Sequence, residues 1–300
     1  MQFDDQNVDV SGVDDRRGGR RVGRGTAVAG GGGIIGLITV ILVVLLGGGS
    51  GLAPGAVDVT GLPTGALDGG ASGETLEELS TRCNAEGAID EYADCFLIKV
   101  YNETDEVWAA ELARRGEEYR RPALTFFEGQ VSTACGPATS QVGPFYCPGD
   151  EHIYLDIGFL QQLQAQLGAE GRYAQAYILA HEFGHHLQTV LGVERQVRRA
   201  QQANPRQANA LSVRMELQAD CLAGVWGRLA DDAGNVTISS GEVAEAQEAA
   251  AAVGDDRIQS SAGQRVDPER WTHGSAADRQ AWYTTGYSTG DLNRCDTFAG

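Results

Sequence analysis

Positive charge is scarce in this chain. Its 300 residues include 23 lysines and arginines against 41 aspartates and glutamates, which gives a formal net charge of −18. Binding to a phosphate backbone requires a basic face, so this composition argues against a nucleic-acid partner. The acidity is more consistent with solubility than with the choice of a substrate. Hydrophobic residues make up 42% of the chain, which is enough for a packed core.

Two common functional patterns are also missing. The chain has no Gly-x-Ser-x-Gly turn, which carries the nucleophile of many Ser-His-Asp hydrolases. It has no Cys-x-x-Cys pair either, so a zinc site built from thiolates is not expected. No internal repeat is present, and the length allows one or two domains.

Histidine is rare as well, yet three of the five histidines fall within residues 181–186, which read His-Glu-Phe-Gly-His-His. The spacing of the apolar residues around them predicts a helix over 173–192. Positions four apart share one face of a helix, so His181 and His185 can present two imidazoles to one metal ion. Zinc suits this pair, because two ring nitrogens fill half of a tetrahedral shell. Glu182 is placed to reach a water molecule on the metal and not the metal itself.

A second predicted helix, around residues 214–221, supplies the acidic residues that such a site needs. A catalytic zinc takes three protein ligands and leaves a position for water, and a carboxylate is a common third ligand. Glu216 lies far enough beyond the histidines for a second helix to return beside the first. Asp220 is one turn further on the same face, where it can accept a hydrogen bond from the far nitrogen of a zinc-bound histidine. The combined pattern resembles that of the gluzincin peptidases.

His186, His273 and Tyr154 lie outside this pattern. His186 is rotated by about 100° from His185, so we expect it to pack and not to bind the metal. Peptide hydrolysis also needs a donor to the developing oxyanion, and His273 and Tyr154 are candidates. A solvated histidine in a turn and a tyrosine in a core strand are the ordinary interpretations of these two residues.

These residues predict a zinc-dependent peptidase. Zinc on the two motif histidines and Glu216 would activate a water molecule, while Glu182 would take the water's proton and deliver it to the leaving amine. The alternative is a non-catalytic zinc-binding scaffold protein of the cell envelope, in which a fourth protein ligand such as His152 or His273 closes the site. An intramembrane protease is not expected, because polar residues flank the zinc helix and the one apolar run is distant.

The N-terminal quarter predicts a membrane attachment. Residues 1–26 are polar, Gly-rich and end in an arginine cluster, so we expect a disordered cytoplasmic segment. Residues 27–46 carry no charge and can cross a bilayer as a helix, with a cleaved signal peptide as the alternative. No lysine or arginine follows until Arg82, so the positive-inside rule places the rest of the chain outside the cytoplasm. Residues 47–73 predict a flexible tether to a catalytic domain at 74–300.

The six cysteines suit such an oxidising compartment. Fifteen pairings are possible, so any pairing is a hypothesis, and a buried free thiol at Cys221 is an alternative. Neighbours in the sequence would form the disulfides Cys83–Cys95, Cys135–Cys147 and Cys221–Cys295.

The domain pattern predicts a mostly helical α+β fold with a small sheet. Helix is expected over 74–119, strands at 123–127 and 152–156, and a helix over 239–253 that opens with a capping box. The Gly- and Pro-containing stretch 135–147 predicts a loop. Two strands before the zinc helix suit a peptidase, because a sheet edge can hydrogen-bond an extended substrate.

From Cys135 onward, the motifs resemble those of the bacterial predicted neutral zinc metallopeptidases, a family of single-pass membrane proteins with an N-terminal anchor. The likeness spans roughly residues 76–300, and it is specific because several motifs occur in the same order. It implies a zincin-like fold, zinc as cofactor and peptide or protein substrates. The matching motifs are residues 143–148, 154–156, 180–186, 216–221, 254–257 and 272–274.

Overall fold

The computed structural model describes four stretches of the chain, residues 1–3, 7–18, 74–167 and 171–299. The predicted membrane helix at 27–46 and the predicted linker at 47–73 lie outside the described residues. Within the four stretches, no helix is both long enough and apolar enough to cross a membrane.

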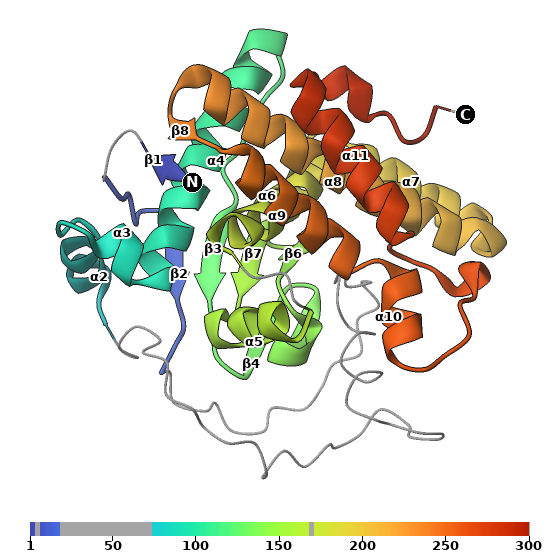
Figure 1. The fold of residues 1–300 in the computed structure, drawn as a ribbon, viewed down its shortest axis with the longest axis horizontal. Helices are drawn as coiled ribbons and strands as arrows, with labels where there is room; N and C mark the ends of the chain where they lie inside the picture. Colours follow the sequence, from blue (N-terminus) through green and yellow to red (C-terminus); the bar gives the residue numbers. More distant parts are fainter. Residues whose placement is uncertain (4–6, 19–73, 168–170, 300) are drawn as a thin grey trace.

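Helices make up most of the described chain, which confirms the prediction of a mostly helical α+β fold (Figure 1). The helices are α2 (Leu76–Cys83), α3 (Ala88–Glu91), α4 (Ala93–Arg115), α5 (Ile157–Leu167), α6 (Arg172–Val190), α7 (Val193–Ala203), α8 (Ala208–Ala233), α9 (Ser240–Ala252), α10 (Asp255–Ser261) and α11 (Ala276–Thr289). The strands are β1 (Gln2–Phe3), β2 (Val13–Asp15), β3 (Ala123–Phe126), β4 (Gln130–Thr133), β5 (Gly136–Thr139), β6 (Phe145–Cys147), β7 (His152–Leu155) and β8 (Val236–Thr237).

The main sheet has four strands in the order β2-β3-β7-β6. Strands β2, β3 and β7 run parallel, and β6 runs antiparallel to β7. The strands predicted at 123–127 and 152–156 are confirmed as β3 and β7, and they lie side by side. The loop predicted at 135–147 is wrong in part, because β5 and β6 lie within it. The composition of this stretch, with its Gly and Pro residues, does not indicate strands. They are stabilised by pairing, β5 with β4 and β6 with β7.

The N-terminal residues belong to the same fold, so the prediction of disorder for residues 1–26 is wrong where the structure describes them. Strand β1 pairs with β8, and β2 extends the main sheet along β3. Val8 and Val13 are buried in the core. Arg17 is also buried and forms an ion pair with Asp94 at the start of α4. Composition suggested disorder here because it does not reveal that these charges have fixed partners.

This pairing bears on membrane topology. The backbone amide of Arg16 donates to the carbonyl of Phe126, and that of Leu124 donates to the carbonyl of Gly12, each at 2.9 Å. Neighbouring strands of one sheet cannot lie on opposite sides of a bilayer, because their hydrogen bonds hold them about 4.8 Å apart. The predicted arrangement, with a cytoplasmic N-terminus and an extracytoplasmic domain, stays a prediction, and it would require β2 to leave this sheet.

Helices α6, α8 and α11 pack closely where the sequence has small residues. A Cβ atom on Gly184 of α6 would lie 2.9 Å from the Cα atom of Ala219 on α8. A Cβ atom on Gly286 of α11 would overlap the carbonyl of Cys221 on α8. These two glycines therefore allow α8 to lie against α6 and α11, in the helical part of the molecule shown in Figure 1.

Three disulfides are present, and they are the pairs of sequence neighbours. The alternative of a free thiol at Cys221 is excluded, because this residue is bonded to Cys295. The bond joins α8 to the short C-terminal 3-10 helix η4 (Leu292–Cys295) and so fixes the end of the chain on α8.

Candidate metal centre

The two motif histidines and Glu216 come together where α6 packs against α8. Each of the three residues offers a ligand atom, and these atoms lie within 4.8 Å of one another. Nε2 of His181 is 3.2 Å from one carboxylate oxygen of Glu216, and Nε2 of His185 is 3.6 Å from the other. All three side chains are buried. The structure thus gathers the three residues that the spacing singled out.

This donor set fits a zinc ion. Ligands at about 2.0–2.1 Å from a tetrahedral centre are about 3.3 Å apart, close to both nitrogen–oxygen distances. Nε2 of His185 has no hydrogen-bond partner among the described residues. An unpaired buried polar atom costs about 1–3 kcal/mol, and coordination of a metal would remove this cost.

The other nitrogen of each ring is held by a different kind of acceptor. Nδ1–H of His181 donates to Asp220 at 2.9 Å, as the spacing on the helices predicts. Nδ1–H of His185 donates to the amide oxygen of Gln188, also at 2.9 Å. The Gln188 amide nitrogen in turn donates to the carbonyl of Met215 on α8. Both rings therefore direct Nε2 toward Glu216.

Gln188 was missed from the sequence. Its only signal is its position three residues after His185, where a polar side chain interrupts the buried face of α6. A glutamine in that place has many ordinary interpretations, so the residue could not be singled out.

The charges of the site stabilise one another. Burial acts to lower the pKa of His181, but Asp220 and Glu216 outweigh it and raise this pKa to about 9. Burial acts to raise the pKa of Glu216, but the adjacent His185 and His181 hold it well below its usual range. The carboxylates therefore favour positive charge at this point, and a metal ion has to displace a proton from His181 when it binds.

Glu182 lies beside this group and is 0% exposed. Neither of its carboxylate oxygens has a hydrogen-bond partner of good geometry among the described residues. Burial raises its pKa, and the charges of His185 and His181 oppose that rise. A carboxylate with a raised pKa in a dry site is suited to accept a proton near neutral pH.

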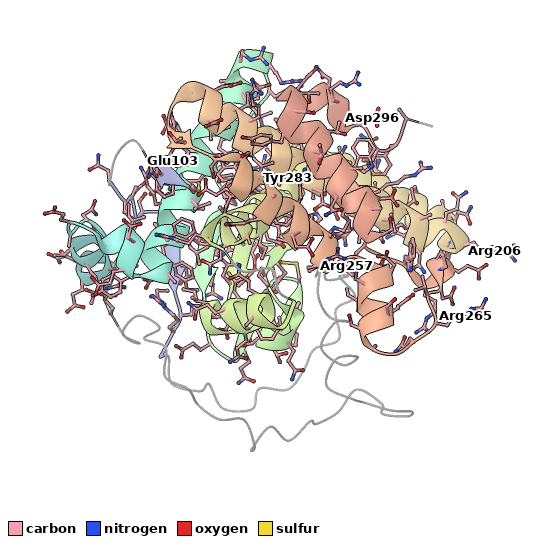
Figure 2. The ribbon with its side chains drawn as sticks, in the orientation of Figure 1. Glu103, Arg206, Arg257, Arg265, Tyr283 and Asp296 are labelled. Atoms are coloured by element: carbon pink, nitrogen blue, oxygen red, sulfur yellow. A yellow bond between two sulfur atoms is a disulfide. The ribbon has the colours of Figure 1, made fainter. Side chains whose placement is uncertain are left out.

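His273 lies close to the group without belonging to it. It is buried in the segment before α11. Its backbone amide donates to Asp255 at 2.7 Å, and its Nδ1–H donates to the same carboxylate at 3.2 Å. Asp255 thus orients the His273 ring, whereas Arg257 from the same motif pairs with Glu248 at the surface (Figure 2).

Tyr154 and His152 have partners elsewhere. The Tyr154 hydroxyl donates to Asp150 at 2.8 Å, and its ring stacks on that of Phe145. Nδ1 of His152 is hydrogen-bonded to the hydroxyl of Thr125 at 2.8 Å. Among the described residues, neither of them contacts the group of His181, His185 and Glu216. The prediction that Tyr154 belongs to the site is therefore not supported.

His186 packs, as expected from its rotation on the helix. Its Nε2–H donates to the carbonyl of Arg120 at 2.6 Å, and its Nδ1 is 3.1 Å from the hydroxyl of Tyr146. The ring therefore connects α6 to β6 and to the segment before β3.

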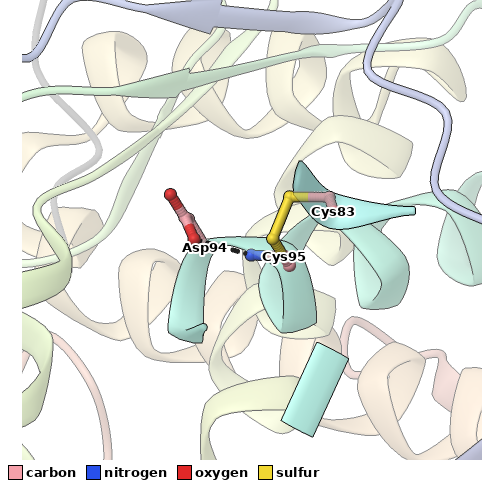
Figure 3. A group of neighbouring side chains, drawn as sticks. All are labelled: Cys83, Asp94 and Cys95. Carbon is pink, nitrogen blue, oxygen red and sulfur yellow. Dashed lines mark hydrogen bonds between the residues drawn. A yellow bond between two sulfur atoms is a disulfide. The ribbon is translucent and has the colours of Figure 1, made fainter. Parts of the chain in front are cut away.

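A second group of metal-ligand types is found at Cys83, Asp94 and Cys95 (Figure 3). The two sulfur atoms are bonded to each other, and Asp94 forms ion pairs with Arg17 and Arg82. These atoms are already used, so this group is a structural one.

Comparison with known proteins agrees with the site. The chain matches the model of the family described as "Putative neutral zinc metallopeptidase" over residues 1–298. Uncharacterized protein YpfJ of Escherichia coli (strain K12) is 40% identical over 243 residues, which cover 81% of each chain. Uncharacterized protein Rv2575 of Mycobacterium tuberculosis is 45% identical over 228 residues, which cover 73% of this chain and 75% of that one. No solved structure matches the chain.

Proposed function

Because the chain belongs to the neutral zinc metallopeptidase family, whose cofactor is zinc, we propose that it hydrolyses peptide bonds at the centre formed by His181, His185 and Glu216. One observation carries this proposal. Three buried donors converge on one point, and within the described part of the chain no side chain donates a hydrogen bond to either carboxylate oxygen of Glu182 beside them. A buried carboxylate without such hydrogen bonds is costly, and proton transfer is a function that explains its presence.

The roles of the side chains follow from their positions. Zinc, when bound, would polarise the scissile carbonyl and make a water molecule more acidic. Glu182 would accept the proton of that water on a carboxylate oxygen and deliver it to the leaving amine. His273, whose ring Asp255 orients through Nδ1, would in its doubly protonated form donate from Nε2–H to the oxyanion that develops on the carbonyl.

Strand β6 supports a peptide as the substrate. It is the outer strand of the main sheet on the side of β7. The backbone amide of Tyr146 in β6 lies near enough to Glu182 to lower its pKa. An extended peptide that paired with β6 would therefore bring its own backbone next to the proposed base.

A non-catalytic zinc scaffold is less well supported. A structural zinc site is closed by four protein ligands, whereas the group found in the described chain has three. The two histidines considered as a fourth ligand, His152 and His273, are not part of that group among the described residues. A position left for water favours catalysis.

The three disulfides support an extracytoplasmic location for the domain. We propose that residues 1–18 lie in the same compartment, because β2 is part of the domain's sheet. Attachment to a membrane through residues 27–46 stays a prediction from the sequence. The proposal differs from that prediction in placing residues 1–18 and the domain on the same side of the membrane.

The proposal is tested with the purified full-length protein. Replacement of His181, His185 or Glu216 by alanine should remove stoichiometric zinc, measured by elemental analysis, and abolish hydrolysis of a fluorogenic peptide library. His152→Ala is the matched control, a histidine of the same domain that should leave the zinc content intact. Full zinc in Glu216→Ala would refute the assigned third ligand. A zinc-loaded parent protein that cleaves no peptide of the library would favour the scaffold.

A further inference from the structure

Arg279 is a buried charged residue that the proposed reaction does not use. It lies on α11, outside both helices that carry the metal ligands, and it is 0% exposed. Its Nε donates to one oxygen of Asp220 at 2.7 Å, and its Nη2 donates to the other at 2.8 Å. Such a two-bond pairing between a guanidinium and a carboxylate fixes the plane of both groups.

Asp220 is the carboxylate that orients His181. The oxygen that accepts from His181 also accepts from the Tyr177 hydroxyl and from Arg279. Tyr177 is in turn 3.3 Å from the Arg279 guanidinium. Four donors thus hold Asp220 in one orientation.

We propose that Arg279 is a positioning residue of the metal centre, which acts through Asp220 to direct Nε2 of His181 toward Glu216. The proposal rests on the proposed zinc site but not on catalysis. A carboxylate that orients a zinc-bound histidine typically contributes 10–100-fold to metal affinity. Without Arg279, Asp220 would lose two of its four hydrogen bonds and keep only those from Tyr177 and His181, so its carboxylate would no longer be fixed in one plane.

The close packing of α8 and α11 places Arg279 at this point. Gly224 of α8 would, with a Cβ atom, overlap the Tyr283 carbonyl of α11, and Gly286 faces α8 in the same way. Tyr283 itself is buried and donates to Tyr173 of α6 at 3.1 Å (Figure 2). The C-terminal helix is therefore held against both metal-binding helices.

The two ligand histidines differ in this respect. His181 has an ionised acceptor balanced by Arg279, whereas His185 has the neutral amide of Gln188. Loss of Arg279 should therefore disturb one ligand and leave the other in place. The expected result is a weakened and altered metal site, and not complete loss of metal.

The test compares Arg279→Met and Arg279→Lys with the control Arg17→Met. Arg17 is also a buried arginine, paired with Asp15 and Asp94, and neither carboxylate belongs to the group of His181, His185 and Glu216. Zinc affinity is measured by competition with a chromophoric chelator, and the absorption spectrum of the cobalt-substituted protein reports ligand geometry. Arg279→Met should weaken zinc 10–100-fold and change the cobalt spectrum. Arg279→Lys should restore part of the affinity, because it keeps the charge.

Arg17→Met should lower the unfolding temperature while zinc affinity and the cobalt spectrum of the folded protein stay as in the parent. Unchanged affinity and spectrum in folded Arg279→Met would overturn the proposal. If Arg279→Met does not fold, the test uses Arg279→Lys and Tyr177→Phe, which each change one partner of Asp220. Zinc affinity and a cobalt spectrum equal to those of the parent in both variants would overturn the proposal. A parent that binds zinc but cleaves no peptide would refute the proposed catalysis and leave this measurement valid.

Discussion

Replacement of Glu182 by glutamine tests the proposed chemistry most directly. The substitution keeps the size of the side chain and removes its capacity to accept a proton near neutral pH. No side chain of the described residues donates a hydrogen bond to Glu182, and the amide oxygen of glutamine can still accept from the nearby backbone amide of Tyr146. Zinc content and fold should therefore be those of the parent.

The expected loss of activity follows from the role of a general base. Such a group contributes 10²–10⁴ to the rate, which corresponds to about 2.7–5.4 kcal/mol of the activation barrier. Hydrolysis of the fluorogenic peptide library by Glu182→Gln should fall by at least the lower factor. A rate within tenfold of the parent would refute the assignment of the base.

Stability should change in the opposite direction. Burial raises the pKa of Glu182 above its value in the unfolded chain, so the protonated carboxyl is favoured on folding. In the metal-free protein, the contribution of Glu182 to the free energy of unfolding is fully present below the pKa of the unfolded state. This contribution is lost as the pH rises through the pKa of the folded state. Glutamine does not titrate, so the variant's free energy of unfolding at pH 7, measured with denaturant, should equal or exceed that of the parent.

Glu103→Gln is the matched control. Glu103 is a buried glutamate of α4 whose pKa is also raised by burial, and Figure 2 labels it near β1. It pairs with Lys99 and not with any proposed ligand. Its replacement should alter stability and leave the rate of hydrolysis unchanged, so an equal loss of activity in both variants would indicate a general effect on the fold.

Three further outcomes are expected. Zinc affinity should rise with pH up to about 9, because His181 must lose its proton on binding, and calorimetry in two buffers should detect that released proton; affinity independent of pH would contradict the pKa of His181. His186→Ala should keep full zinc but lower the free energy of unfolding by about 1–3 kcal/mol, because the Arg120 carbonyl loses its donor; zinc loss would make His186 part of the site. Tags at the two ends of the chain should show the same protease accessibility in intact cells, and opposite accessibility would refute the pairing of β2 with β3.

The part of the site that could be predicted from sequence is the part that depends on local geometry. His181 and His185 share a helix face by spacing alone, and Glu216 and Asp220 do so on α8. The capping box at Ser239 and Glu242 was also predicted and is formed. In each case the two positions of the pair lie within about one turn of the same helix.

Contacts between distant segments could not be predicted in the same way. Strand β2 has only three residues, and its partner β3 begins more than a hundred positions later, so no periodicity marks the pairing. Arg279 likewise meets Asp220 only through the packing of α11 on α8. An isolated arginine on a C-terminal helix is typical of an exposed residue, and its burial follows from the fold.

The arrangement also shows that the zinc motif on α6 does not suffice for a metal site. Glu216 and Asp220 reach the motif from α8, which can lie close enough because Gly184 has no side chain. The next residue on α8, Cys221, is bonded to Cys295, and Arg279 holds Asp220 from α11. The orientation of His181 thus depends on residues nearly a hundred positions beyond it. Destabilisation of the C-terminal helix should therefore reach the metal centre before it reaches the sheet, because α11 contacts α8 along its length while β3 and β7 are held by their own backbone pairing.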